Sequence, residues 1–249
     1  MWSIKVVPEC APERWHHMRT VRRTTALVLT CLLAGAALAG CGGGADDAAD
    51  KSAADLLDEA NATMGELSSL TIEITNEAGD DTATWRMTTD LKSRCQVRNT
   101  FSGSGTLEQI RIGGTDYVRP DTKYLETWSG NDLGAARPNV WAKVPVARSK
   151  PGDGLSRCTR PFESFGTATK GEATRIGGRE ALGLEVTDPA DKEGAYTFYV
   201  ATEGEPHLLK AVYDGGKQVT TTSFSDFGEP LDIRPPASAD VLDMSDVTG

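Results

Sequence analysis

The clearest hydrophobic pattern in the chain lies in residues 52–69, where apolar side chains recur at steps of three and four. That spacing predicts a helix with one apolar face. Ser52 can cap its start, and Asp55 three residues later resembles a capping box. Because one face is apolar, we expect this helix to pack on a sheet. The repeat is made by Ala53, Leu56, Leu57, Ala60, Met64 and Leu67.

Most of the remaining pattern alternates with a period of two, which predicts strands of a sheet with one buried face. Glycine pairs at 113–114, 177–178 and 215–216 lie between strand-like runs, as tight antiparallel hairpins require. The alternating sets are Leu70, Ile72 and Ile74; Trp85, Met87 and Leu91; Tyr196, Phe198 and Val200; and Leu208, Lys210 and Val212. The sequence therefore predicts an α+β fold dominated by an antiparallel sheet.

The middle and the end of the chain are less regular. Residues 121–136 could form a helix, and residues 141–144 predict a short strand that ends at Pro145. Residues 146–170 are rich in Gly, Pro, Ser and Lys and predict a loop with a short helix. Residues 224–237 predict a last strand that runs into an extended proline segment, after which we expect the chain to fray.

The first 40 residues resemble an export signal rather than part of a fold. Basic residues 19–23 precede an apolar run at 24–39, which ends in Leu-Ala-Gly before Cys41. This order is typical of a bacterial lipoprotein signal, in which the cysteine is lipidated and becomes the mature first residue. A plain secretory signal and an N-terminal anchor remain the alternatives. Residues 1–17 are expected to lie upstream of the true start at Met18.

Removing this leader changes the charge and the number of cysteines. Its five basic and two acidic residues, taken from totals of 26 and 36, leave 21 and 34, a net charge of −13. Such a surface repels nucleic acid, so we expect no nucleic-acid partner. Residues 41–51, rich in Gly and Asp, predict a flexible tether, and residues 52–249 a single domain. Cys95 and Cys158 predict a disulfide in an exported protein, with two unpaired buried thiols as the alternative.

The sequence carries no recognisable catalytic or metal-binding motif. It has no nucleophile elbow, HExxH, CxxC, P-loop or dinucleotide fingerprint. His207, the only histidine after the leader, follows Pro206 and is expected in a surface turn. Asp80 and Asp81 lack the ligand spacing of a calcium loop. We therefore expect a protein that is not an enzyme and holds no cofactor or metal.

Large aromatic residues are the remaining distinctive group in a chain that is only 6% aromatic. They either fill the core between helix and sheet or line an apolar cavity for an acyl chain, and both alternatives use the same residue types. The candidate cavity-lining residues are Trp85, Phe101, Trp128, Trp141, Phe162 and Phe165.

The order of these motifs resembles actinobacterial lipoproteins of the LppX/LprG type, which are similar in architecture to the lipoprotein carrier LolA. The matching features are Cys41, the helix at 52–69, the hairpin at 111–119, the strand at 141–145, the second hairpin at 174–178 and the closing segment at 224–236. The resemblance implies a half-barrel, a strongly curved antiparallel sheet packed on an N-terminal helix and a few short helices. It also implies binding of lipids or acylated molecules.

Two functions follow as expectations. The first is an extracytoplasmic protein, held at the cell membrane by lipid on Cys41, that binds a lipid or acyl chains and could carry them. The second is a non-catalytic interaction or sensor module that presents loops to a membrane protein. The volume of any cavity would discriminate between them.

Overall fold

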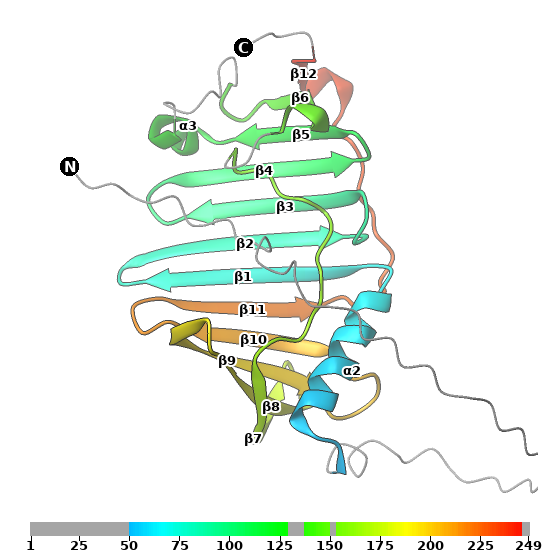
Figure 1. The fold of residues 1–249 in the computed structure, drawn as a ribbon. Helices are drawn as coiled ribbons and strands as arrows, with labels where there is room; N and C mark the ends of the chain where they lie inside the picture. Colours follow the sequence, from blue (N-terminus) through cyan, green and yellow to red (C-terminus); the bar gives the residue numbers. More distant parts are fainter. Residues whose placement is uncertain (1–49, 129–136, 150–152, 246–249) are drawn as a thin grey trace, which may run out of the picture. The chain divides into compact units, whose positions relative to one another are not determined.

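The computed structural model describes residues 50–128, 137–149 and 153–245. The alternating segments of this part of the chain form one 12-stranded sheet, in the order β12-β6-β5-β4-β3-β2-β1-β11-β10-β9-β8-β7 (Figure 1). The strands are β1 (Leu70–Ala78), β2 (Asp81–Thr89), β3 (Arg94–Phe101), β4 (Gly105–Ile112), β5 (Thr115–Pro120), β6 (Trp141–Pro145), β7 (Thr167–Ile176), β8 (Arg179–Asp188), β9 (Asp191–Ala201), β10 (Leu208–Asp214), β11 (Val219–Ser225) and β12 (Val241–Asp243).

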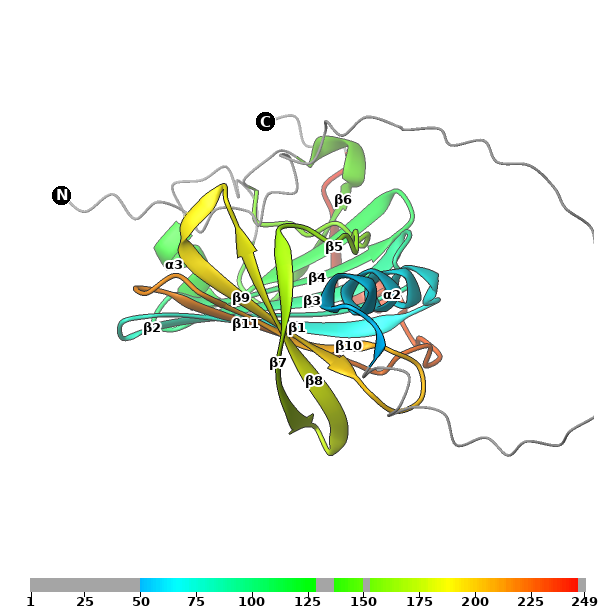
Figure 2. The ribbon, with the colours of Figure 1, turned by 60° about the horizontal axis from the view of Figure 1, so that its bottom comes forward.

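The sheet is strongly coiled, as the right-handed twist of its many strands requires. In Figure 2, β7 and β8 run across the direction of β1 to β5. Every neighbouring pair is antiparallel except β12 with β6, which is parallel. The predicted α+β half-barrel is therefore confirmed, with one parallel pair that we did not expect.

The predicted N-terminal helix is α2 (Ala53–Glu66), and its cap is the expected one. The Asp55 backbone N–H donates to Ser52 Oγ, and that hydroxyl donates to the Asp55 carboxylate. The apolar face packs against β7, β9 and β10. The helix ends three residues before the predicted end, because Leu67 already has extended backbone and β1 follows at Leu70.

The three glycine pairs all lie in hairpin turns, as predicted. Residues 113–114 join β4 to β5, residues 177–178 join β7 to β8, and residues 215–216 lie between β10 and β11. Gly113, Gly177, Gly178 and Gly216 have positive φ, which glycine adopts without a steric penalty. Leu91 lies beyond β2, also with positive φ, so its predicted place in that strand was wrong.

The predicted helix at 121–136 is seen as α3 (Thr122–Trp128), and the rest of that range lies outside the described residues. The predicted strand at 141–144 is β6. The predicted short helix after it is the 3₁₀ turn η1 (Val146–Arg148). The predicted loop ends earlier than expected, since β7 begins at Thr167.

Residues 153–166, which we call the crossing segment, have no regular secondary structure and run across the sheet towards β7 (Figure 1). Cys158 in this segment forms a disulfide with Cys95 of β3, with a Cα–Cα distance of 5.3 Å. The predicted pairing is therefore present. It fixes an irregular segment to the middle of the sheet.

The end of the chain differs from the prediction. After β11, residues 226–240, which we call the C-terminal segment, lead to η2 (Ser238–Asp240) and then to β12. The chain therefore pairs once more instead of fraying. Two features explain this. The Ile233 side chain is buried, at 3% exposed, and Lys143 Nζ of β6 donates to the Asp243 carboxylate of β12 over 2.7 Å. In the described part of the chain, no helix is long and apolar enough to cross a membrane.

Candidate functional site

The strand register divides the side chains between two faces of the sheet. Ile72 lies opposite Met87 and, on its other side, Phe224. This set packs in one cluster with the apolar side of α2 and with Cys158, and we call its side of the sheet the inner face. Thr71 and Thr88 also lie opposite each other, with their hydroxyls 3.0 Å apart, and they project from the outer face.

The inner face carries six half-buried aromatic side chains, in one group of four and one pair, which together we call the aromatic row. Phe165 lies with its ring centroid 4.9 Å from Tyr196 and 5.8 Å from Phe198, and Tyr196 lies 4.7 Å from Tyr213. Offset and edge-on ring packing of this kind is favourable. The row comprises Phe162, Phe165, Tyr196, Phe198, Tyr213 and Phe224.

Burial also affects the polar end of this row. It raises the pKa of Tyr196 to about 12, and the neighbouring Asp191 carboxylate adds to the shift. The Tyr196 hydroxyl, which stays protonated at neutral pH, donates to Asp191 over 3.3 Å. The Tyr196 side chain is therefore uncharged at neutral pH.

The crossing segment is held on the inner face by hydrogen bonds as well as by the disulfide. Trp85 Nε1 donates to Ser156 Oγ over 2.8 Å, and Thr89 Oγ1 donates to the Cys158 carbonyl over 2.6 Å. At the other end, Asn61 of α2 donates to Ser164 Oγ. These contacts place the segment over the centre of the sheet and join it to the helix.

A buried polar network on β4 and β5 also holds the crossing segment. Arg111 and Asp116 form an ion pair whose side chains are 9% and 0% exposed. Gln109 donates to Asp116 and to the Ser156 carbonyl, and it accepts from the Ser156 backbone N–H. A buried charge is tolerated when it is paired and hydrogen-bonded. This network therefore fixes the register between β4, β5 and the crossing segment.

The candidate cavity residues fall into three groups rather than one. Trp85, Phe162 and Phe165 pack on the main inner-face cluster. Phe101 and Trp128 pack with Leu107, Val118 and Tyr124 where α3 contacts the sheet. The structure thus brings together three of the six residues in one cluster and two in a second.

Trp141 lies apart from the other five, on the outer face. It packs against Ile110 and Ile233, and the Arg119 guanidinium lies 4.5 Å from its ring centroid. Trp141 lies one position before Ala142, which is in register with Val118 of the inner face, and in a strand one position reverses the face. Its aromatic character alone could not reveal this.

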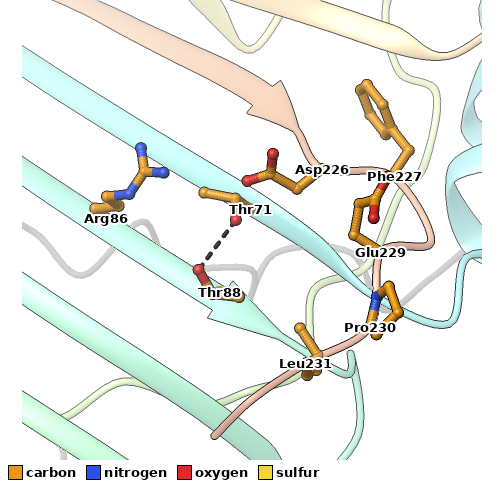
Figure 3. Close-up of a pocket in the computed structure, with 8 residues that line it drawn as sticks. All are labelled: Thr71, Arg86, Thr88, Asp226, Phe227, Glu229, Pro230 and Leu231. Atoms are coloured by element: carbon orange, nitrogen blue, oxygen red, sulfur yellow. Dashed lines mark hydrogen bonds between the residues drawn. The ribbon is translucent and has the colours of Figure 1, made fainter.

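The outer face holds a hollow of about 630 Å³ between strands β1 and β2 and the C-terminal segment (Figure 3). Its lining is mixed in polarity and comprises Thr71, Arg86, Thr88, Asp226, Phe227, Glu229, Pro230 and Leu231. Arg86 is paired with Glu73 over 3.0 Å. The hollow therefore lacks the apolar lining expected for an acyl chain.

His207 is not the simple surface residue that its position beside Pro206 predicts. Its ring is half-buried and stacks on Phe227, with 4.3 Å between centroids. Burial and the nearby Arg179 guanidinium lower the pKa of His207. Among the described residues, no group of three or more His, Cys, Asp and Glu side chains is placed to hold a metal ion.

Comparisons with known proteins agree with this architecture. No family model matches the chain, and no curated protein matches it. The solved structure of LprF from Mycobacterium bovis aligns with 74% of this chain and 97% of its own, at 14% identity and a TM-score of 0.50. The lipoprotein LppX of Mycobacterium tuberculosis aligns with 72% of this chain and 98% of its own, at 14% identity and a TM-score of 0.48. The likeness to LprF confirms, at the level of the fold, the resemblance seen in the sequence.

Several residues of the inner face were not among the sequence candidates. The alternation of Tyr196, Phe198 and Val200 marked a buried strand face, yet it did not indicate that the two aromatic residues stay half exposed. Tyr213 and Phe224 gave no separate signal. Only the register of β9, β10 and β11 brings these residues together.

Proposed function

We propose that this protein binds an acyl chain of a lipid or acylated molecule on its inner face, along the aromatic row. The single observation that carries this proposal is the exposure of the row. Six large aromatic side chains gather on one face and remain only half-buried. Contiguous apolar surface left open to water is typical of a binding site.

The row has the chemistry that an acyl chain needs. Transfer of such a chain from water is worth roughly 0.8 kcal/mol per buried CH₂ group. The side chains are uncharged, and the crossing segment supplies Phe162 and Phe165 as a wall above the strands. A ligand lying there would complete the burial of rings that the protein alone covers in part.

We further propose that the domain acts at the extracytoplasmic side of a membrane, held there by lipid on Cys41. The ten residues between Cys41 and Ser52 reach at most about 36 Å when extended. That reach would keep the inner face close to the bilayer from which a lipid would be taken. The net charge of −13 expected after cleavage makes direct attraction to anionic headgroups unfavourable.

A second candidate function is favoured by a different observation. The crossing segment fills the centre of the inner face and is fixed there by a disulfide. A filled and covalently fixed face suits a rigid interaction module, which would present its hairpin turns to a membrane protein. The two candidates differ in whether the inner face takes up lipid.

Native mass spectrometry tests the first function. Residues 43–249, which cluster as one compact unit, would be incubated with a lipid extract, and circular dichroism would confirm that they fold. We expect a discrete added mass that organic solvent releases. A bare mass before and after incubation would exclude acyl binding and favour the interaction module.

The proposed lipid anchor on Cys41 can be tested separately. We expect the full chain expressed in a bacterium to be found in the membrane fraction with Cys41 as its acylated first residue. The Cys41→Ser variant should lose the acyl mass. Peptide mass spectrometry of the membrane-extracted protein would reveal an unmodified Cys41 if the proposed anchor were wrong.

A further inference from the structure

Two polar atoms at the α3 end of the inner face are shielded from solvent, and neither has a hydrogen-bond partner among the residues that the structure describes. They are the side-chain oxygen Oδ1 of Asn99 and the indole nitrogen Nε1 of Trp128. Leaving a buried polar group unpaired costs about 1–3 kcal/mol. One atom is an acceptor and the other is a donor, so together they offer a complementary pair of unused hydrogen bonds.

Both atoms belong to one neighbourhood at the α3 end of the inner face. Asn99 lies opposite Trp85 on one side and Leu107 on the other. The Trp128 ring lies 6.0 Å from Phe101 and 6.0 Å from Tyr124, and all three aromatic residues pack on Leu107. We call this neighbourhood the α3 subsite, defined by Asn99, Phe101, Leu107, Tyr124 and Trp128.

The orientation of the Asn99 amide follows from its neighbour. Its nitrogen Nδ2 lies 3.4 Å from the Gly154 carbonyl oxygen, which can only accept a hydrogen bond. The reversed amide would place two acceptors against each other. Asn99 Oδ1 therefore faces away from Gly154 as an acceptor without a donor.

The charge of the surroundings limits which ligand groups can hydrogen-bond to these two atoms. The Asp153 carboxylate lies close enough to Tyr124 to raise the pKa of that phenol, after the larger effect of burial. A second anion would be repelled there. A carboxylate, ester or ether oxygen can only accept, and an ammonium group can only donate.

We propose that the α3 subsite binds a hydroxyl group of the ligand, which donates to Asn99 Oδ1 and accepts from Trp128 Nε1. This inference rests on the proposed function, because it names the polar group of the same ligand. Five inter-strand steps separate β3 from β9, about 24 Å at roughly 4.8 Å each. The hydroxyl would therefore mark one end of a long-chain amphiphile whose acyl part extends beside the crossing segment towards the aromatic row.

Two uncharged probes with the same alkyl chain test the subsite: 1-hexadecanol, which carries one hydroxyl, and hexadecane, which carries no hydrogen-bonding group. Native mass spectrometry of the full mature protein, released from detergent micelles with equal amounts of both probes, would measure their bound ratio. Two net hydrogen bonds predict a preference of about tenfold for the hydroxylated probe.

The variants Asn99→Leu and Trp128→Phe each remove one of the two polar atoms and keep most of the side-chain volume. Each should lower the ratio to about threefold, the share of one hydrogen bond, and the double variant should bring it close to one, while hexadecane stays bound as before. Gln96→Leu is the matched control, because Gln96 lies on the same strand as Asn99 but projects from the outer face, in register with Thr88 and Ile110. Thermal melts would show that every variant folds.

Each outcome decides the matter. A preference that falls in each subsite variant, disappears in the double variant and persists in Gln96→Leu supports the proposal. Equal binding of the two probes, or a preference that survives both subsite changes, overturns the subsite and leaves acyl binding standing. If neither probe binds the wild-type protein, acyl binding fails, and the subsite fails with it.

Discussion

The inner and outer faces of this sheet both carry apolar clusters, but they are covered in different ways. On the outer face, Leu231 and Ile233 of the C-terminal segment pack over Ile110 and Trp141, and Trp141 is only 9% exposed. On the inner face, the crossing segment covers the centre and leaves the aromatic row half-buried. The C-terminal segment thus covers the cluster around Trp141, whereas the aromatic row stays partly open, which separates a stabilising cluster from the proposed binding surface.

The largest expected effect comes from releasing the cover of the inner face. Cys95 and Cys158 close a loop with a sequence separation of 63, for which the chain-entropy model predicts about 4 kcal/mol. Replacing both by alanine should lower the free energy of unfolding by that amount in urea titrations. A loss below about 1 kcal/mol would mean that hydrogen bonds such as that from Thr89 hold the crossing segment without the disulfide.

Trp141→Ala should cost about 3 kcal/mol, because large buried aromatic residues leave a cavity when truncated. Trp141 also contacts the Arg119 guanidinium. Since it lies on the outer face, binding of an acyl probe should not change. Urea unfolding and native mass spectrometry of the same variant would check both parts. A loss of probe binding in a folded variant would contradict the separation of the two faces.

Phe165→Ala should lower stability less than Trp141→Ala does, but it should weaken acyl binding. Its half-buried ring contacts Tyr196 and Phe198, so truncation should cost about 1–2 kcal/mol of stability, less than full burial would give. Acyl probe binding should fall about tenfold, because the crossing segment would lose part of its wall over the row. Trp141→Ala serves as the matched control. If Phe165→Ala bound the probe normally, the row would be core rather than a binding surface.

The sequence predicted the elements of the fold better than it predicted the site. Periods of 3.6 and 2 were sufficient for α2, the strands and the hairpin turns, because these patterns are local. The candidate site residues were chosen as large aromatic side chains, and that choice could not separate Trp85 from Trp141. Which face each occupies depends on pairing between strands up to about 150 residues apart, as with β1 and β11.

The C-terminal segment was missed for a related reason. Pro230, Pro235 and Pro236 indicate an end of regular pairing, and they do end it locally. What returns the chain to the sheet is Ile233, a single buried residue within a polar and proline-rich stretch. One apolar residue has no periodicity, so pattern analysis cannot detect its docking site on Ile110 and Trp141.

Gly194→Ala should have a smaller effect on stability, and it tests how tightly Tyr213 is held at the end of the aromatic row. A Cβ at Gly194 would lie 2.1 Å from Cε2 of Tyr213, so that ring would have to move. We expect a loss of about 1 kcal/mol together with a change in tyrosine near-ultraviolet circular dichroism. Gly79→Ala is an unsuitable control because φ is positive there, whereas Gly114→Ala, with open space around its Cβ, should leave the spectrum unchanged.

The smallest expected effect is a pH dependence of stability that arises from His207. His207 stacks on Phe227, and the charged groups that face it are Arg179 and Glu205. Burial and Arg179 lower the pKa of His207 below its ordinary value of 6.5, so the folded state binds this proton less readily than the unfolded chain does. The contribution of neutral His207 to stability is therefore complete above about pH 6.5 and is lost as the pH falls through the lowered pKa.

Melting temperatures of the wild type and of His207→Gln between pH 7.5 and 5 would measure this contribution. The wild type should lose more stability than the variant as the pH falls, because glutamine does not titrate in this range. Acyl probe binding should keep the same pH profile in both proteins, since the stacked pair lies on the outer face. Equal slopes of stability against pH would show that His207 titrates alike in the folded and unfolded states, and a changed binding profile would show that the two faces are coupled.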